Sequence, residues 1–155
     1  MVKKIIKIAV ILLVIAFVVI QFFRPDFTNP PENPADTLEA STQVPADVDA
    51  ILNRSCADCH SQRTVYPWYS KIAPSSWLLS SDIREGRQEL NISVWNTYET
   101  RKKVRKLGAI CDQVTKGDMP LWQYRLIHWN ARLNEGEVKT LCDWTDAEIN
   151  RLQPQ

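Results

Sequence analysis

The strongest chemical signal in this chain is a short run of reactive side chains, Cys56-Ala57-Asp58-Cys59-His60. Two cysteines three positions apart lie on one helical turn, so their thiols can add to the two vinyl groups of a haem. The imidazole of the next residue, His60, can then bind the iron. The sequence therefore predicts one covalently bound haem c, with Cys56 and Cys59 as attachment points and His60 as an axial ligand.

The second axial ligand has few candidates, because the chain contains two methionines and two histidines. Met119 follows Gly117, which can end a helix, and precedes Pro120, which stiffens the loop. A thioether favours ferrous iron and raises the reduction potential, which suits an electron carrier. We predict Met119 as the sixth ligand. His128 is the alternative, although we expect it to be a hydrogen-bonded residue of an aromatic segment, and an open or water-bound position is the third option.

Two further side chains near the motif are candidates for contacts with the cofactor. Trp68 is one of six tryptophans, all of which follow residue 46, and its indole N–H can donate to a haem propionate. The second ring nitrogen of His60 needs an acceptor to orient the imidazole. We expect either the hydroxyl of Ser61 or a backbone carbonyl in that role.

Cys111 and Cys142 remain after the haem thiols are assigned. Both fall on apolar stripes of predicted helices, and an even pair outside the cytoplasm favours a disulfide over two buried thiols. A zinc site or a thiol-redox Cys-x-x-Cys is a third reading of the four cysteines. The sequence favours it least, because the βαβ pattern of thiol-redox proteins is absent.

The domain that carries these residues is predicted to be all-α, since no segment alternates β-branched residues as a strand would. Asn96 with Glu99 and Asn134 with Glu137 resemble capping boxes at helix starts. The four predicted helices run from Pro45 into the haem motif, from Pro74–Trp77 to Leu90, from Asn96 to Gly117, and from Asn134 to Ile149. We expect them to form a cytochrome c-like domain over residues 46–155.

Residues 1–23 are predicted to form a membrane anchor, because three lysines precede an apolar stretch that reaches Phe23. This pattern predicts an uncleaved, single-pass helix in the bacterial inner membrane, with the haem domain on the periplasmic side. Residues 24–45 are rich in proline and poor in apolar residues, which predicts a linker.

The charge of the chain gives no argument for nucleic acid, since the formal net charge is only +1. One local run of cations stands out. If it lies beside the haem edge, it can steer an acidic redox partner by long-range attraction. The run consists of Arg101, Lys102, Lys103, Arg105 and Lys106.

A series of short blocks along the chain has a recognisable order of aromatic, proline and haem-motif residues. These blocks are Cys56–Ser61, Tyr66–Ser70, Ile72–Trp77, Glu85–Arg87, Leu90–Ser93, Trp95, Met119–Pro120, Tyr124 and His128. With them the chain resembles the bacterial haem-binding domain family of small c-type cytochrome-like domains, often joined to a membrane anchor. The resemblance covers nearly all of residues 46–150 and implies a helical fold around one haem, with Cys56 and Cys59 as attachment points and His60 as axial ligand. Cys111, Cys142 and Trp129 depart from the family pattern.

Two functions are compatible with this reading. The first is a membrane-tethered electron carrier that transfers single electrons through one covalent haem. The alternative is a haem-based ligand sensor or a peroxidase-like enzyme with an open or labile sixth position. Peroxidase chemistry needs an acid/base group near the iron, and His128 is the sole candidate. The sequence therefore favours the carrier over an enzyme.

Overall fold

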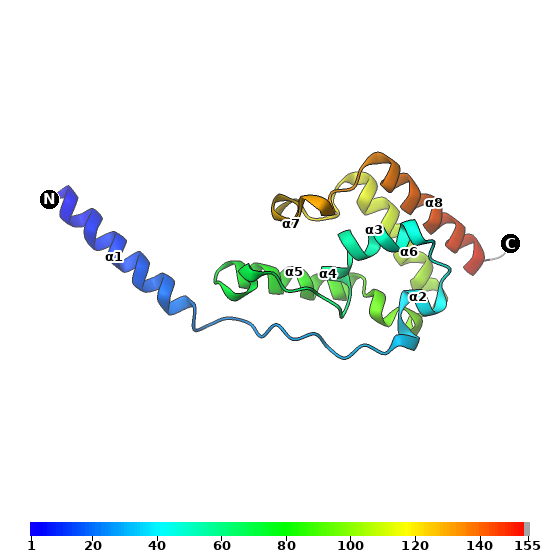
Figure 1. Ribbon diagram of the computed structural model, residues 1–155, viewed down its shortest axis with the longest axis horizontal. Helices are drawn as coiled ribbons and strands as arrows, with labels where there is room; N and C mark the ends of the chain where they lie inside the picture. Colours follow the sequence, from blue (N-terminus) through cyan, green and yellow to red (C-terminus); the bar gives the residue numbers. More distant parts are fainter. Residues whose placement is uncertain (154–155) are drawn as a thin grey trace.

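The computed structural model describes residues 1–153, and every regular element in that range is helical, which confirms the all-α prediction. The chain forms an elongated helical domain with α1 extending from one end (Figure 1). The α-helices are α1 (Val2–Ile20), α2 (Leu38–Ser41), α3 (Ala46–Ser55), α4 (Ala57–His60), α5 (Ser75–Glu89), α6 (Thr100–Lys116), α7 (Trp122–Ile127) and α8 (Glu135–Leu152). The 3-10 helices are η1 (Pro34–Asp36), η2 (Trp68–Lys71), η3 (Ile92–Thr97) and η4 (Trp129–Ala131).

The four predicted helices correspond to α3, α5, α6 and α8. The capping box of α8 is present, with the Asn134 side chain bonded to the backbone of Glu137 and the Glu137 side chain bonded back. The predicted start of α6 at Asn96 is wrong. Asn96 lies inside η3, and the extended backbone at Tyr98 and Glu99 separates this 3-10 helix from α6, which begins at Thr100.

The hydrophobic core forms where α6 and α8 pack along each other and meet α3 and η3. Leu107 of α6, Leu141 of α8 and Trp95 of η3 are almost completely buried there. Apolar area removed from water stabilises the fold by about 25 cal/mol per Å². Helix α3 packs against this core and leads directly into the haem motif.

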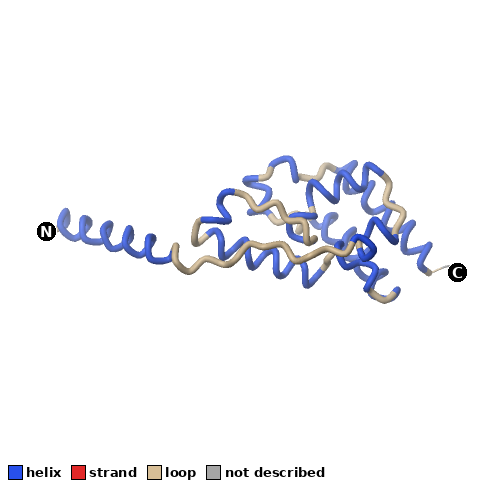
Figure 2. Tube along the Cα trace, turned by 60° about the horizontal axis from the view of Figure 1, so that its bottom comes forward, coloured by secondary structure: helices blue, strands red, loops and turns tan. Residues whose placement is uncertain are grey.

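The segment that we predicted to be a linker, residues 24–45, lies against the domain. Residues 24–33 form a loop without regular structure (Figure 2), and the short helices η1 and α2 follow. The Asn29 amide donates to the Thr64 carbonyl at 2.9 Å, and Glu39 pairs with Arg63 at 2.8 Å. Leu38 is fully buried in the core. This part of the chain therefore contributes to the packing of the domain.

The predicted transmembrane helix is wrong, and the predicted single-pass location in the inner membrane is overturned with it. Within residues 1–153, no helix combines the length and the apolar character that a membrane crossing demands. Helix α1 has 19 residues, ends at Ile20 instead of Phe23, and carries three lysines in its first two turns. Its uninterrupted apolar part, from Ile8 to Ile20, is about 20 Å long, against the roughly 30 Å of a bilayer core.

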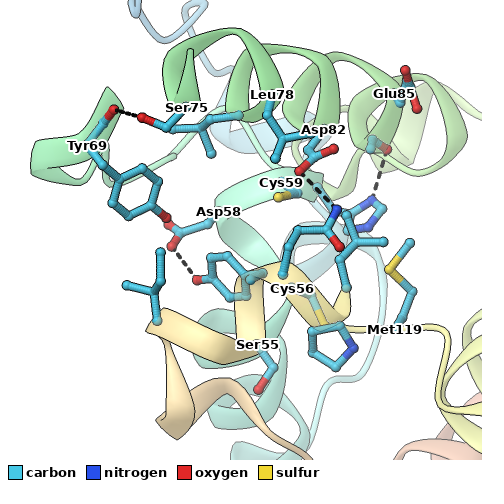
Figure 3. A pocket seen from close by; sticks show the side chains of 18 of the residues that line it. Ser55, Cys56, Asp58, Cys59, Tyr69, Ser75, Leu78, Asp82, Glu85 and Met119 are labelled. Atoms are coloured by element: carbon cyan, nitrogen blue, oxygen red, sulfur yellow. Dashed lines mark hydrogen bonds between the residues drawn. The ribbon is translucent and has the colours of Figure 1, made fainter. Parts of the chain in front are cut away.

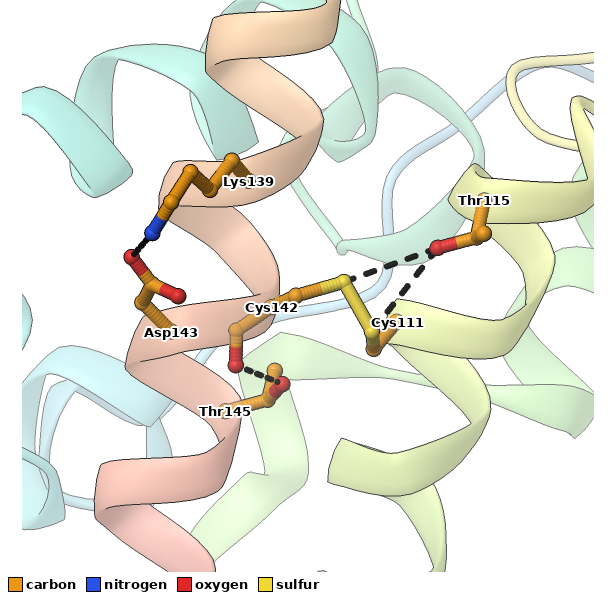
Figure 4. Close-up of a disulfide and its surroundings, with 6 residues drawn as sticks. All are labelled: Cys111, Thr115, Lys139, Cys142, Asp143 and Thr145. Carbon is orange, nitrogen blue, oxygen red and sulfur yellow. Dashed lines mark hydrogen bonds and ion pairs between the residues drawn. A yellow bond between two sulfur atoms is a disulfide. The ribbon is translucent and has the colours of Figure 1, made fainter.

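A disulfide joins Cys111 of α6 to Cys142 of α8, as the leftover pair of cysteines predicted (Figure 4). The two Cα atoms are 4.8 Å apart, and the bridge spans 31 positions of the chain. The hydroxyl of Thr115 lies 3.8 Å from the Cys111 sulfur and 3.6 Å from the Cys142 sulfur. The bridge fastens the two longest helices of the core to each other.

We expect the double variant Cys111→Ser/Cys142→Ser to lose about 3.5 kcal/mol of unfolding free energy, because the bridge restricts the unfolded chain. Urea unfolding of the variant and of the parent protein measures the loss. A reductant should destabilise the parent and leave the variant unchanged. Equal stability of the two proteins, with and without reductant, would contradict a stabilising role.

Candidate functional site

The haem motif sits at the junction of α3 and α4. The backbone changes direction at Cys56, whose carbonyl accepts hydrogen bonds from the N–H groups of Cys59 and His60 at 3.2 and 2.9 Å. This single turn brings the side chains of Cys56, Cys59 and His60 to the wall of one cavity. The spacing of the motif therefore places all three side chains at one cavity.

The cavity has a volume of about 620 Å³ and lies between α4, α5 and α7 (Figure 3). A second cavity of about 360 Å³ lies on the α6 side and shares Cys56, His60 and Met119 with the first. Sites for cofactors typically measure 300–1,000 Å³ and are mainly apolar. The apolar and aromatic residues of the first cavity are Trp68, Tyr69, Ile72, Leu78, Leu79, Met119, Pro120, Leu121, Tyr124 and Ile127.

The imidazole of His60 is oriented by backbone carbonyls. Its Nδ1 atom lies 2.9 Å from the Gly86 oxygen and 3.0 Å from the Leu90 oxygen. Carbonyl oxygens only accept hydrogen bonds, so Nδ1 carries the proton and Nε2 keeps its lone pair. Burial lowers the pKa of His60, which favours the neutral ring, although the two carbonyl contacts oppose that shift. The Nε2 atom of His60 is therefore unprotonated, which is the state in which an imidazole nitrogen can bind a metal.

Ser61, the other predicted partner of His60, has a different role. Its hydroxyl donates to the Ala57 carbonyl at 2.7 Å and accepts from the Arg63 N–H at 2.9 Å. Ser61 is completely buried and stabilises the end of α4. Backbone carbonyls, and not the Ser61 hydroxyl, therefore orient the imidazole of His60.

The thiols of Cys56 and Cys59 are free. Burial raises the pKa of each to about 12, and for Cys59 the nearby carboxylates of Asp82 and Asp58 add to the shift. Thiol-redox catalysis uses thiolates, which this environment disfavours. Within residues 1–153, no cluster of three or more histidine, cysteine or acidic side chains is arranged to hold a metal ion.

Met119 reaches the cavities from the end of α6. Gly117 adopts a left-handed conformation with φ of 73°, which turns the chain out of the helix. The N–H groups of Asp118 and Met119 then both bond to the Gln113 carbonyl, at 3.0 and 3.2 Å. This local structure positions the Met119 side chain in the wall of both cavities that His60 lines.

His128 is placed elsewhere. Its Nε2 atom is 2.9 Å from the Tyr69 hydroxyl, and its ring stacks on Tyr124 with the centroids 4.2 Å apart. It belongs to neither cavity wall. The structure therefore brings together His60 and Met119, and it holds His128 against Tyr69 and Tyr124.

Trp68 stands at the rim of the first cavity, where 72% of its surface is exposed. Its ring meets Tyr69 edge to face, with the centroids 5.8 Å apart. A contact between Trp68 and a haem propionate stays a prediction.

Two contacts at the site were not predicted from the sequence. The Tyr124 hydroxyl donates to Asp58 Oδ2 at 2.7 Å and so ties α7 to the haem motif. Gly86 of α5 approaches the motif so closely that an added Cβ would lie 2.8 Å from the Cys59 carbonyl oxygen. A glycine inside a helical pattern is a signal for such an approach, and Gly86 has that position.

The donor set of these cavities can be compared with what a c-type haem requires. Two neutral thiols on one turn, an imidazole with a free Nε2, a thioether and a mainly apolar wall all match the needs of that group. These residues fit a covalently bound haem.

The fold and the cavity together define a small all-α domain with a mainly apolar pocket large enough for a cofactor. The chain belongs to the haem-binding domain family, whose sequence profile matches residues 15–147. Haem is accordingly the cofactor of this protein. No curated protein and no solved structure matches the chain.

Proposed function

We propose that the protein is an electron carrier that holds one covalent haem c, attached through Cys56 and Cys59 and bound at iron by His60 and Met119. The haem would supply a one-electron iron couple. One observation carries the proposal: His60 and Met119 line the same two cavities. The free thiol of Cys56 lines both of these cavities, and the free thiol of Cys59 lines the first.

The residues of the chain have distinct roles in this proposal. The carbonyls of Gly86 and Leu90 hold the Nδ1 proton of His60 and fix the ring orientation. Met119 supplies a soft ligand, which favours the reduced state. The apolar wall excludes water. If His60 and Met119 both held the iron, binding of a further ligand there would be disfavoured. The proposal therefore prefers the carrier over a sensor or a peroxidase-like enzyme.

We propose that the redox partner docks by charge. Arg101 and Arg105 are exposed on α6, where they can attract an acidic surface. Lys102 lies over the Tyr98 ring at 4.0 Å, and Lys103 donates to the Asn96 side chain at 3.3 Å. The exposed arginines are therefore the cations of this run that best fit a partner surface.

The test of the proposed function is covalent retention of haem. We expect protein matured with haem-attachment machinery to keep its haem after denaturation, and the Cys56→Ser/Cys59→Ser variant to release it, because the thioether bonds would be absent. Visible absorption of the denatured, gel-filtered protein measures retention. The Cys111→Ser/Cys142→Ser variant is the control, since it removes two cysteines outside the cavities.

A parent protein that releases its haem on denaturation would refute covalent attachment. Ready binding of carbon monoxide by the reduced parent would refute the carrier and favour the sensor or enzyme, because a closed six-coordinate iron resists that ligand.

A further inference from the structure

The charged residues around the two cavities are distributed unevenly. In the described part of the chain, the charged side chains that line the first cavity are all carboxylates, and several of them are visible in Figure 3. They are Asp58, Asp82, Glu85 and Glu89. Across both cavity walls the single cation of the described residues is Lys106, which lines the second cavity.

The surroundings of Lys106 leave its charge poorly compensated. Its side chain is only 12% exposed, and its ion-pair partner, Glu89, lies 3.6 Å away with a side chain that is 84% exposed. Within residues 1–153, the Lys106 ammonium donates no hydrogen bond of ordinary length. A largely buried ammonium is costly without a close anion, and a solvated carboxylate compensates little. Lys106 therefore has capacity for a second, better placed anion.

Haem brings such an anion to this place. Its two propionates are carboxylates, which lysine binds by charge-assisted hydrogen bonds. In the proposed function, the haem lies between His60 and Met119, which belong to the walls of both cavities. A propionate edge directed into the first cavity would face four carboxylates and no cation of the described residues. One directed into the second cavity would meet Lys106 and a single carboxylate, Glu89, which lines both cavities.

We propose that Lys106 binds a haem propionate, so that the propionate edge of the cofactor points toward α6. Gln113 lines the same cavity two helical turns further along α6 and offers an amide N–H to the same group. Trp68, the propionate contact predicted from the sequence, stands at the rim of the carboxylate-lined cavity. This inference rests on the proposed function. It directs the propionate edge of the haem away from Trp68, opposite to the orientation that a contact with Trp68 would require.

The inference predicts specific effects of changing Lys106 in the full-length, haem-loaded protein. Lys106→Gln should shift the propionate bending band in the resonance Raman spectrum and lower the reduction potential, because loss of a nearby cation favours ferric iron. Lys106→Arg should keep both properties near those of the parent, since it retains the charge and the donors. Lys116→Gln removes an exposed lysine from the end of the same helix and should change neither property.

The outcomes separate this inference from the proposed function. If the band shifts in Trp68→Phe and stays unchanged in Lys106→Gln, the propionates face the first cavity and the inference is overturned. An unchanged band in both variants overturns it as well. Loss of covalent haem from the parent protein instead refutes the proposed function. If Lys106→Gln fails to fold, the test rests on Lys106→Arg. This variant must then give a folded, haem-loaded protein with the parental propionate band.

Discussion

Replacing Met119 by alanine should abolish the sulfur-to-iron absorption near the red edge of the ferric spectrum and lower the reduction potential. The thioether stabilises ferrous iron, and its loss exposes the sixth position to water. Axial ligands set haem potentials over a range of about 0.8 V, and we expect a fall on the order of 0.1 to 0.3 V here. The same variant should bind carbon monoxide in the reduced state. Absorption spectroscopy and potentiometric titration measure these effects.

His128→Ala is the matched control for this prediction. Its imidazole bonds to the Tyr69 hydroxyl and stacks on Tyr124, outside both cavity walls. The variant should keep the red-edge band and most of the parental potential. If the band is absent from the parent protein, or disappears in His128→Ala and survives in Met119→Ala, the methionine assignment is wrong.

The parts of the site that could be predicted from the sequence are those that depend on a few consecutive residues. The Cys-x-x-Cys-His spacing fixes one turn, and the structure turns all three reactive side chains of the motif into one cavity. Gly117 ends α6 in the left-handed conformation that glycine favours, and Asn134 caps α8. Each of these features depends on fewer than about six consecutive residues.

The rest depends on contacts between distant parts of the chain. Asp58 and Tyr124 are 66 positions apart and meet because α7 folds back over the motif. Leu38 enters the core although its neighbourhood is rich in proline, since a single apolar residue produces no periodic signal. The anchor prediction failed for a different reason: it counted residues up to Phe23, whereas the helix ends at Ile20.

Gly86→Ala should be the most damaging small substitution at the site. Its added Cβ would lie 2.8 Å from the Cys59 carbonyl oxygen and 3.1 Å from the Cys59 Cβ. The backbone of the motif cannot yield as a flexible side chain would, so α5 must move away from α4. Overpacking of this kind costs about 1 to 3 kcal/mol, against about 1 kcal/mol gained from the better helix former. We expect a net loss of up to about 2 kcal/mol in urea unfolding.

The substitution should also disturb the iron ligand, because the Gly86 carbonyl accepts the Nδ1 proton of His60. Moving α5 lengthens this contact, frees the imidazole to rotate and should broaden the low-spin haem spectrum. Gly108→Ala in α6 is the control, since an added Cβ there meets nothing within 4 Å and should stabilise the protein by about 1 kcal/mol. If both alanine variants are equally stable and have the parental spectrum, the close approach of α5 to the motif does not hold His60. A loss confined to Gly86→Ala ties the orientation of the iron ligand to the packing of two helices.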